Sequence, residues 1–183
     1  MRKALALVAT LAAGPALAVG LEIEVEGAHT EGVIKIDLYE DVAPLHVERI
    51  TTLAQQGFYD GVYFHRVIDG FMAQTGDGEF GKSPQTLNRA GTGGSDLPDL
   101  PAEFSDIPFE RGTVGMARSQ SPDSANSQFF IMFAPGDFLN GNYTVVGKVT
   151  EGFEVLDNIK RGDLSTLQVT GEPDRMVRVT VTD

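Results

Sequence analysis

The chain has 183 residues, with 26 acidic against 14 basic side chains, a formal net charge of −12 and no cysteine. An acidic surface repels phosphate backbones, so nucleic acid is excluded as the expected partner. The lack of cysteine excludes disulfides, zinc–thiolate sites and thiol nucleophiles, and it suits folding in an oxidising compartment.

Residues 1–18 have the pattern of a secretory signal peptide. Arg2 and Lys3 precede an apolar run, and the segment 16–18 (Ala-Leu-Ala) has small residues at the two positions that a signal peptidase reads. The run is too short to span a bilayer, and no second apolar stretch reaches that length. We therefore expect cleavage after Ala18, a periplasmic location, and a single mature domain of residues 19–183 that is soluble and monomeric.

The mature region is dominated by short strand patterns. Leu21, Ile23 and Val25 alternate with glutamates, and the same period of two recurs further along. We expect further strands at 33–39, 62–66, 71–75, 113–117, 128–133, 144–149 and 176–182. About eight strands with few helices predict a mainly β fold, a closed or nearly closed antiparallel barrel, since closure removes exposed edges.

Two segments have helical patterns and are expected to cap the barrel. The first covers 41–56, with Asp41 as its N-cap, Pro44 in its first turn and Gly57 at its end. Its inward stripe is expected to contain Leu45, together with Ile50, Leu53 and Ala54. The second covers 153–160. Between the strand patterns, residues 76–108 form a long irregular stretch of the kind that is usually functional or disordered.

The usual catalytic residue sets are missing. The three histidines, at 29, 46 and 65, have no spacing typical of metal ligands, and the sequence contains no HExxH and no CxxC. The glycine-rich segment 90–96 lacks the lysine and the strand–helix context of a phosphate-binding loop. We therefore expect no metal and no cofactor.

An unusual concentration of aromatic, methionine and glutamine residues remains. A period of two places Met72 with Gln74 on one face of a strand, and Gln128 with Phe130 on one face of another. Apolar residues on strands usually belong to a core. Buried amides need hydrogen-bond partners, so these faces could instead form a binding groove, and the pattern alone leaves both interpretations open.

Six segments, taken together, resemble the cyclophilin family of peptidyl-prolyl isomerases. They occur in the family's order and spacing, and the resemblance extends over nearly all of the region 19–183. The segments are FHRVIDGFMAQTGD (64–77), GTGG (91–94), GMA (115–117), ANSQFFI (125–131), FLNG (138–141) and VVGKVTEG (145–152).

The resemblance implies an eight-stranded antiparallel barrel capped by two helices, with an active groove on its outer face. Arg66 corresponds to the catalytic arginine, assisted by Gln74 and Phe71; on spacing alone it could instead be a surface residue paired with Asp69. The substrate is implied to be a proline-containing polypeptide, an unfolded or exported protein. The implied substrate-binding residues are Met72, Gly91, Ala117, Arg118, Gln128, Phe130, Phe138, Leu139 and Tyr143.

Two positions differ from many eukaryotic members, with Phe138 replacing tryptophan and Tyr143 replacing histidine. The loss of the indole N–H implies weaker inhibition by cyclosporin with activity retained. A proline-recognising holdase chaperone with incidental turnover is the alternative function. A ligand-carrying barrel of lipocalin type is disfavoured, because bulky strand residues such as Phe129 and Ile131 predict a filled interior.

Overall fold

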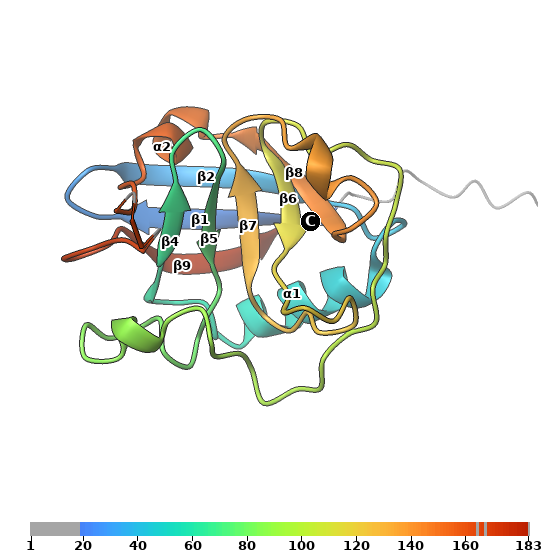
Figure 1. Ribbon diagram of the computed structural model, residues 1–183, viewed down its shortest axis with the longest axis horizontal. Coiled ribbons are helices and arrows are strands. Elements are labelled where there is room, and N and C mark those ends of the chain that lie inside the picture. The colour runs from blue at the N-terminus through green and yellow to red at the C-terminus, as the bar shows by residue number, and fades with distance from the viewer. Residues whose placement is uncertain (1–18, 164, 167, 183) are drawn as a thin grey trace, which may run out of the picture.

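The computed structural model describes residues 19–163, 165–166 and 168–182, so the predicted signal peptide lies outside the described residues. Within them, strands dominate and two α-helices lie at opposite ends of the sheet (Figure 1). The strands are β1 (Gly20–Glu26), β2 (Glu31–Leu38), β3 (Val62–Tyr63), β4 (Arg66–Ile68), β5 (Met72–Thr75), β6 (Thr113–Met116), β7 (Phe129–Met132), β8 (Val145–Glu151) and β9 (Arg175–Thr182). The helices are α1 (Pro44–Gln55), α2 (Phe153–Asn158) and the 3₁₀ turns η1 (Leu87–Arg89) and η2 (Asp137–Leu139).

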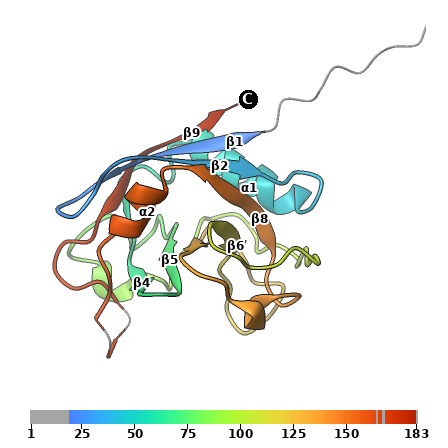
Figure 2. The same cartoon turned by 90° about the horizontal axis from the view of Figure 1, so that it is seen from above.

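The strands form one antiparallel sheet in the order β3-β9-β1-β2-β8-β6-β7-β5-β4. Figure 2 shows the sheet curled, with β1, β2 and β9 in a back wall opposite β4 to β7. The expected closed barrel of eight strands is wrong: the structure has a curled half-barrel of nine strands whose two edges, β3 and β4, do not pair.

The expected strand at 62–66 explains the difference. Its start pairs with β9 and its continuation pairs with β5, so one segment supplies both edges. Between them, the N–H of Phe64 donates to the carbonyl of Asp174 at 2.9 Å, and the N–H of Val169 donates to the carbonyl of His65 at 3.0 Å. The backbone of residues 64 and 65 is therefore hydrogen-bonded to irregular segments, and no strand ladder connects β3 with β4 to close a barrel.

Side chains on β5 and β7 alternate between two cores, as the period of two predicts. Phe129 and Ile131 lie in the main core inside the curl, with Leu21, Ile23 and Val25 of β1. Met72 and Phe130 instead join a smaller cluster on the outer face. This outer face carries the candidate site.

The helix α1 begins differently from the prediction. Its N-cap is Ala43, with no side-chain cap, so the expected cap at Asp41 is wrong. The carboxylate of Glu103 instead accepts the N–H groups of Leu45 and His46, at 3.2 and 3.1 Å. Leu45 is 43% exposed and not part of the inward stripe, whereas Ile50, Leu53 and Ala54 are buried as expected.

The stretch 76–108 is irregular apart from η1, and it runs around the margin of the outer face, below β4 to β7 and up one side (Figure 1). No helix in the described part of the chain is long and apolar enough to span a membrane.

Candidate functional site

The register of three neighbouring strands builds the centre of the site. Arg66 on β4 is opposite Gln74 on β5, and Gln74 is in turn opposite Phe130 on β7. Directly opposed residues share a face of a sheet, so all three side chains project outward. The next position on β6, opposite Phe130, is Gly115. A Cβ there would lie 2.6 Å from Cζ of Phe130, so a glycine is needed for the ring to lie across this strand.

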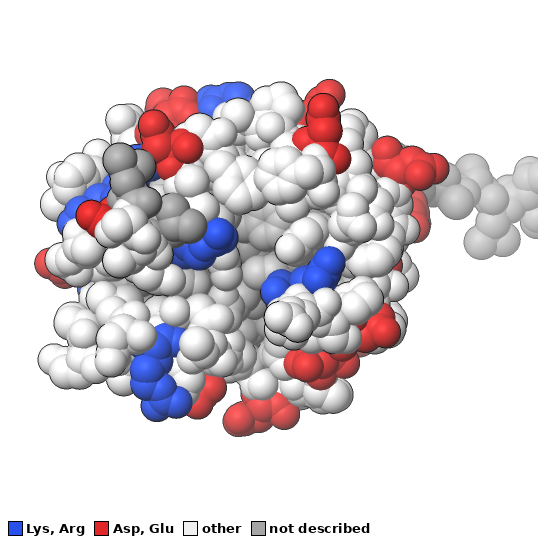
Figure 3. Space-filling view, viewed as in Figure 1, with Lys and Arg blue, Asp and Glu red and all other residues white. Residues whose placement is uncertain are grey.

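An apolar pocket of about 500 Å³ lies over these strands. Met72, Phe130 and Leu139 form buried walls, each 5% exposed or less. The pocket is lined by Arg66, Phe71, Met72, Gln74, Ala117, Arg118, Phe130, Phe138, Leu139 and Tyr143. Figure 3 shows this face hollowed at its centre, with basic side chains on both sides of the hollow and acidic ones nearer the margin.

Aromatic packing fixes the walls of the apolar pocket. The Phe130 ring stacks on Phe109, with ring centroids 5.7 Å apart, and Tyr143 meets it edge-on at 5.8 Å. Phe138 lies at the rim, 69% exposed, with its ring 5.3 Å from that of Phe71. The pocket therefore has a rigid apolar floor and a more exposed rim, an arrangement suited to a small apolar ring.

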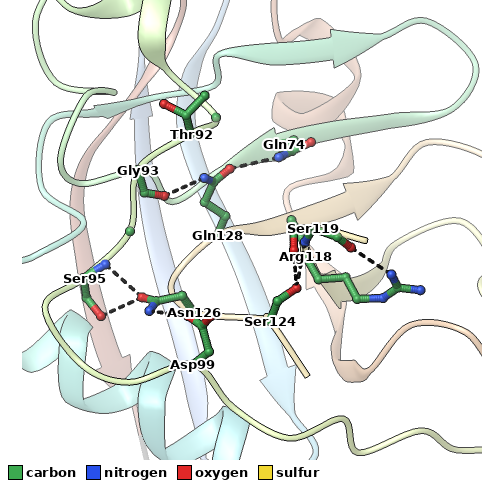
Figure 4. A pocket seen from close by; sticks show the side chains of 13 residues that line it. Gln74, Thr92, Gly93, Ser95, Asp99, Arg118, Ser119, Ser124, Asn126 and Gln128 are labelled. Carbon is green, nitrogen blue, oxygen red and sulfur yellow. Dashed lines mark hydrogen bonds between the residues drawn. The ribbon is translucent and has the colours of Figure 1, made fainter. Parts of the chain in front are cut away.

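A chain of hydrogen bonds holds Arg66 at the side of the pocket. Nη1 of Arg66 donates to Oε1 of Gln74 at 3.1 Å, and Nε2 of Gln74 donates to Oε1 of Gln128 at 2.9 Å. Nε2 of Gln128 donates to the carbonyl of Gly93 at 2.8 Å, and Figure 4 shows this end of the chain. We call the side chains of Gln74 and Gln128 the amide relay. These bonds give both glutamine amides hydrogen-bond partners on an otherwise apolar face.

The amide relay ends on a loop that a buried carboxylate organises. Asp77, which is 0% exposed, accepts the N–H groups of Glu79 and Phe80 on Oδ1 and those of Gly91 and Gly93 on Oδ2, at 2.7 to 3.1 Å. Asp77 lies within the motif 64–77, but its role was not predicted from the sequence. The available signal was an aspartate two residues after the end of β5, ahead of the glycine-rich segment 90–96.

A second, polar pocket of about 350 Å³ adjoins the apolar pocket. Across it, Oδ1 of Asn126 accepts from the N–H and hydroxyl of Ser95 at 2.8 and 2.7 Å, and Nδ2 donates to Asp99 at 3.0 Å (Figure 4). Asn126 and Ser95 were also missed from sequence, since neither has a distinctive spacing. The polar pocket is lined by Gln74, Gly91, Thr92, Gly93, Gly94, Ser95, Asp99, Ala117, Arg118, Ser119, Ser124, Asn126 and Gln128.

The two pockets account for all the site residues expected from sequence. Ten of the twelve line the apolar pocket, and the other two, Gly91 and Gln128, line the polar one. Three of them, Gln74, Ala117 and Arg118, line both pockets and form their common border.

Arg66 is charged at neutral pH, whereas its neighbour His65 is not. Burial lowers the pKa of Arg66, which the nearby Tyr143 partly opposes, but an arginine remains protonated at working pH. The alternative pairing of Arg66 with Asp69 is wrong, because Asp69 binds Nε of Arg161 at 3.0 Å. Burial lowers the pKa of His65 to about 4, so this histidine is neutral at pH 7.

A family model described as cyclophilin type peptidyl-prolyl cis-trans isomerase/CLD matches residues 21–181. A probable peptidyl-prolyl cis-trans isomerase of Brucella suis is 56% identical over 153 residues, covering 82% of this chain and 78% of that protein. The peptidyl-prolyl cis-trans isomerase B of Bacillus subtilis is 39% identical over 132 residues, covering 72% and 85%.

Solved structures give the same likeness. A cyclophilin-type isomerase of Cryptosporidium parvum superposes with a TM-score of 0.76 and 25% identity, covering 91% of this chain and 99% of that one. A structure of that protein in the presence of the dipeptide Ala-Pro gives a TM-score of 0.74 and 26% identity, covering 90% and 99%.

Proposed function

The chain belongs to the cyclophilin-type peptidyl-prolyl cis-trans isomerases, and we propose that it rotates X-Pro peptide bonds in the apolar pocket beside Arg66. One observation carries the proposal. A guanidinium is fixed by an amide at the wall of a pocket whose other lining residues, apart from Arg118, are aromatic or aliphatic. This arrangement offers an apolar pocket for a small ring, with a cation at its side.

The reaction makes and breaks no bond. The barrier to rotation is about 20 kcal/mol and arises from amide resonance, so no nucleophile, metal or proton carrier is required. As the bond twists, the proline nitrogen regains its lone pair and becomes a hydrogen-bond acceptor. Arg66 donates to this nitrogen, since its guanidinium keeps its charge and holds its donors in a fixed fork.

The amide relay contributes by holding the fork still. Gln74 occupies one donor of Arg66 and is itself held by Gln128, so the guanidinium keeps its direction while the substrate rotates. A donor already fixed for the twisted state lowers the barrier without reorganisation. An enhancement of about 10⁵-fold needs about 7 kcal/mol, and hydrogen bonds to developing charge in such sites supply about 3–4 kcal/mol each.

The two pockets bind different parts of the substrate. The proline ring enters the apolar pocket, where Phe71, Met72, Phe130 and Leu139 grip it. The residues before proline lie along the polar pocket, over Gly91 and Ala117. Holding the two ends of the substrate in separate pockets allows one to turn relative to the other about the X-Pro bond.

Export to the periplasm and a role in folding exported proteins are further parts of the proposal. The support is the charged start, apolar run and small-residue cleavage pattern of residues 1–18. The test is expression of the full chain in a Gram-negative host, followed by mass measurement of the protein in each fraction. A periplasmic form starting at Val19 is expected, and a full-length cytoplasmic form would contradict export.

Isomerisation and holding of clients are separated by one experiment. The chain is added to a client whose refolding is limited by a proline, in catalytic and in stoichiometric amounts. Catalysis predicts acceleration by catalytic amounts of the wild-type chain and none by Arg66→Ala at any ratio. Equal rescue by Arg66→Ala would show that the groove holds clients and that turnover is incidental.

A further inference from the structure

The groove is positively charged although the chain is acidic. Arg66 and Arg118 both line the apolar pocket, and no Asp or Glu lines it. Among the residues that the structure describes, the ion pairs include Arg111 with Asp157 and Arg161 with Asp69, but neither groove arginine. In a chain with a net charge of −12, two arginines without a carboxylate partner mark a place where negative charge from outside is favoured.

Arg118 is fixed in position by neutral groups. Its guanidinium donates to the carbonyls of Asn142 at 2.9 Å and Ser119 at 2.9 Å, with longer bonds to Asn142 and Gln120 at 3.3 Å. Its Cζ lies 4.4 Å from the ring centroid of Tyr143. These four bonds use at most four of the five guanidinium N–H groups, and carbonyl oxygens leave the positive charge uncompensated.

The location of Arg118 identifies which substrate residue it meets. Arg118, Gln74 and Ala117 form the border shared by the two pockets. If proline occupies the apolar pocket and the preceding residues occupy the polar one, the residue directly before proline passes this border. The polar pocket beyond it contains the carboxylate of Asp99, which disfavours a second negative charge there.

We propose that the groove prefers an acidic residue directly before proline, with Arg118 as the residue that determines this preference. The inference rests on the proposed function, because it assigns the substrate's proline to the apolar pocket. Arg118 is half-buried, so its attraction for a carboxylate is only partly screened by water. A preference of about 3–10-fold in kcat/KM is expected for Glu over the uncharged, isosteric Gln at low salt.

The test measures isomerisation of peptides of the form Ala-X-Pro-Phe, with X as Glu, Gln or Lys. Exchange between the cis and trans forms is followed by NMR, so that no coupled protease adds its own preference. The expected order for kcat/KM is Glu, then Gln, then Lys, and the Glu/Gln ratio is expected to fall toward 1 as salt is raised to about 0.5 M.

Three variants separate Arg118 from overall charge. Arg118→Gln is expected to reduce the Glu/Gln ratio to about 1, and Arg118→Lys to leave it between 1 and the wild-type value. Arg178→Gln makes the same charge change on the exposed side of β9, in the back wall, and is expected to keep the wild-type ratio.

The outcomes are distinguishable from failure of the proposed function. Active wild-type protein with a Glu/Gln ratio of 1 or below overturns the acidic preference and leaves isomerisation intact. An unchanged ratio in Arg118→Gln also overturns it, by removing Arg118 as its cause. No catalysis of any of the three peptides would overturn the proposed function itself.

Discussion

Asp77 is expected to be one of the most sensitive polar positions in the protein. It is fully buried, and its two oxygens accept four backbone N–H groups, two on each. Asp77→Asn replaces one of these oxygens with an NH₂ group that faces two donors. Each buried donor left unpaired costs about 1–3 kcal/mol, and the loop relaxes in part, so we expect a loss of about 2–4 kcal/mol in the free energy of unfolding.

The measurement is chemical and thermal unfolding of the wild type, Asp77→Asn and the control Asp99→Asn. For a domain of this size the melting temperature of Asp77→Asn is expected to fall by roughly 5–15 °C. Asp99 is exposed and accepts one bond, from Asn126, so Asp99→Asn is expected to change stability by less than about 0.5 kcal/mol. A loss below 0.5 kcal/mol for Asp77→Asn would refute the reasoning.

Three further predictions concern His65, the amide relay and the rim. Burial lowers the pKa of His65 from an ordinary 6.5 to about 4, so the folded protein resists protonation of this side chain. The contribution of His65 to the free energy of unfolding is therefore fully present above pH 6.5 and decreases as the pH is lowered toward 4. The loss in the free energy of unfolding between pH 7 and pH 5 is about 2 kcal/mol. Urea unfolding at the two pH values measures it, and His65→Leu is expected to lack this part of the pH dependence. Gln128→Met removes the bonds to Gln74 and Gly93; kcat/KM is expected to fall about 3–10-fold with little change in KM, and a changed KM at constant kcat would contradict the relay's role. Phe138→Trp restores an indole N–H at the exposed rim and is expected to strengthen cyclosporin inhibition in a titration; equal inhibition of both proteins would show that this donor is unimportant.

The parts of the fold that depend on local periodicity could be predicted from sequence. The period of two placed Phe129 and Phe130 on opposite faces of β7, and the structure puts them in separate clusters. The pattern alone did not decide whether the face of Phe130 was core or groove, and only the family resemblance implied a groove there. The residues expected at the site lie in short motifs, and the strand register brings those motifs to the two pockets.

The parts that depend on distant residues could not be predicted. The start of α1 is stabilised by Glu103, 58 positions from Leu45, so the nearby Asp41 was chosen wrongly. Asp69 pairs with Arg161, 92 positions away, and not with Arg66. The open edge between β3 and β4 likewise depends on how one segment divides between two partners, which no local pattern specifies.

The proposed mechanism depends most on the directed donors of Arg66. Arg66→Lys tests them directly, because it keeps the positive charge but loses the planar fork that Gln74 holds. The measurement is kcat/KM of this variant on an Ala-Pro test peptide, beside the wild type and with folding checked by circular dichroism. A loss of 100-fold or more, about 2.7 kcal/mol in the barrier, is expected. Isomerisation of the test peptide by Arg66→Lys at the wild-type rate would contradict the assigned mechanism.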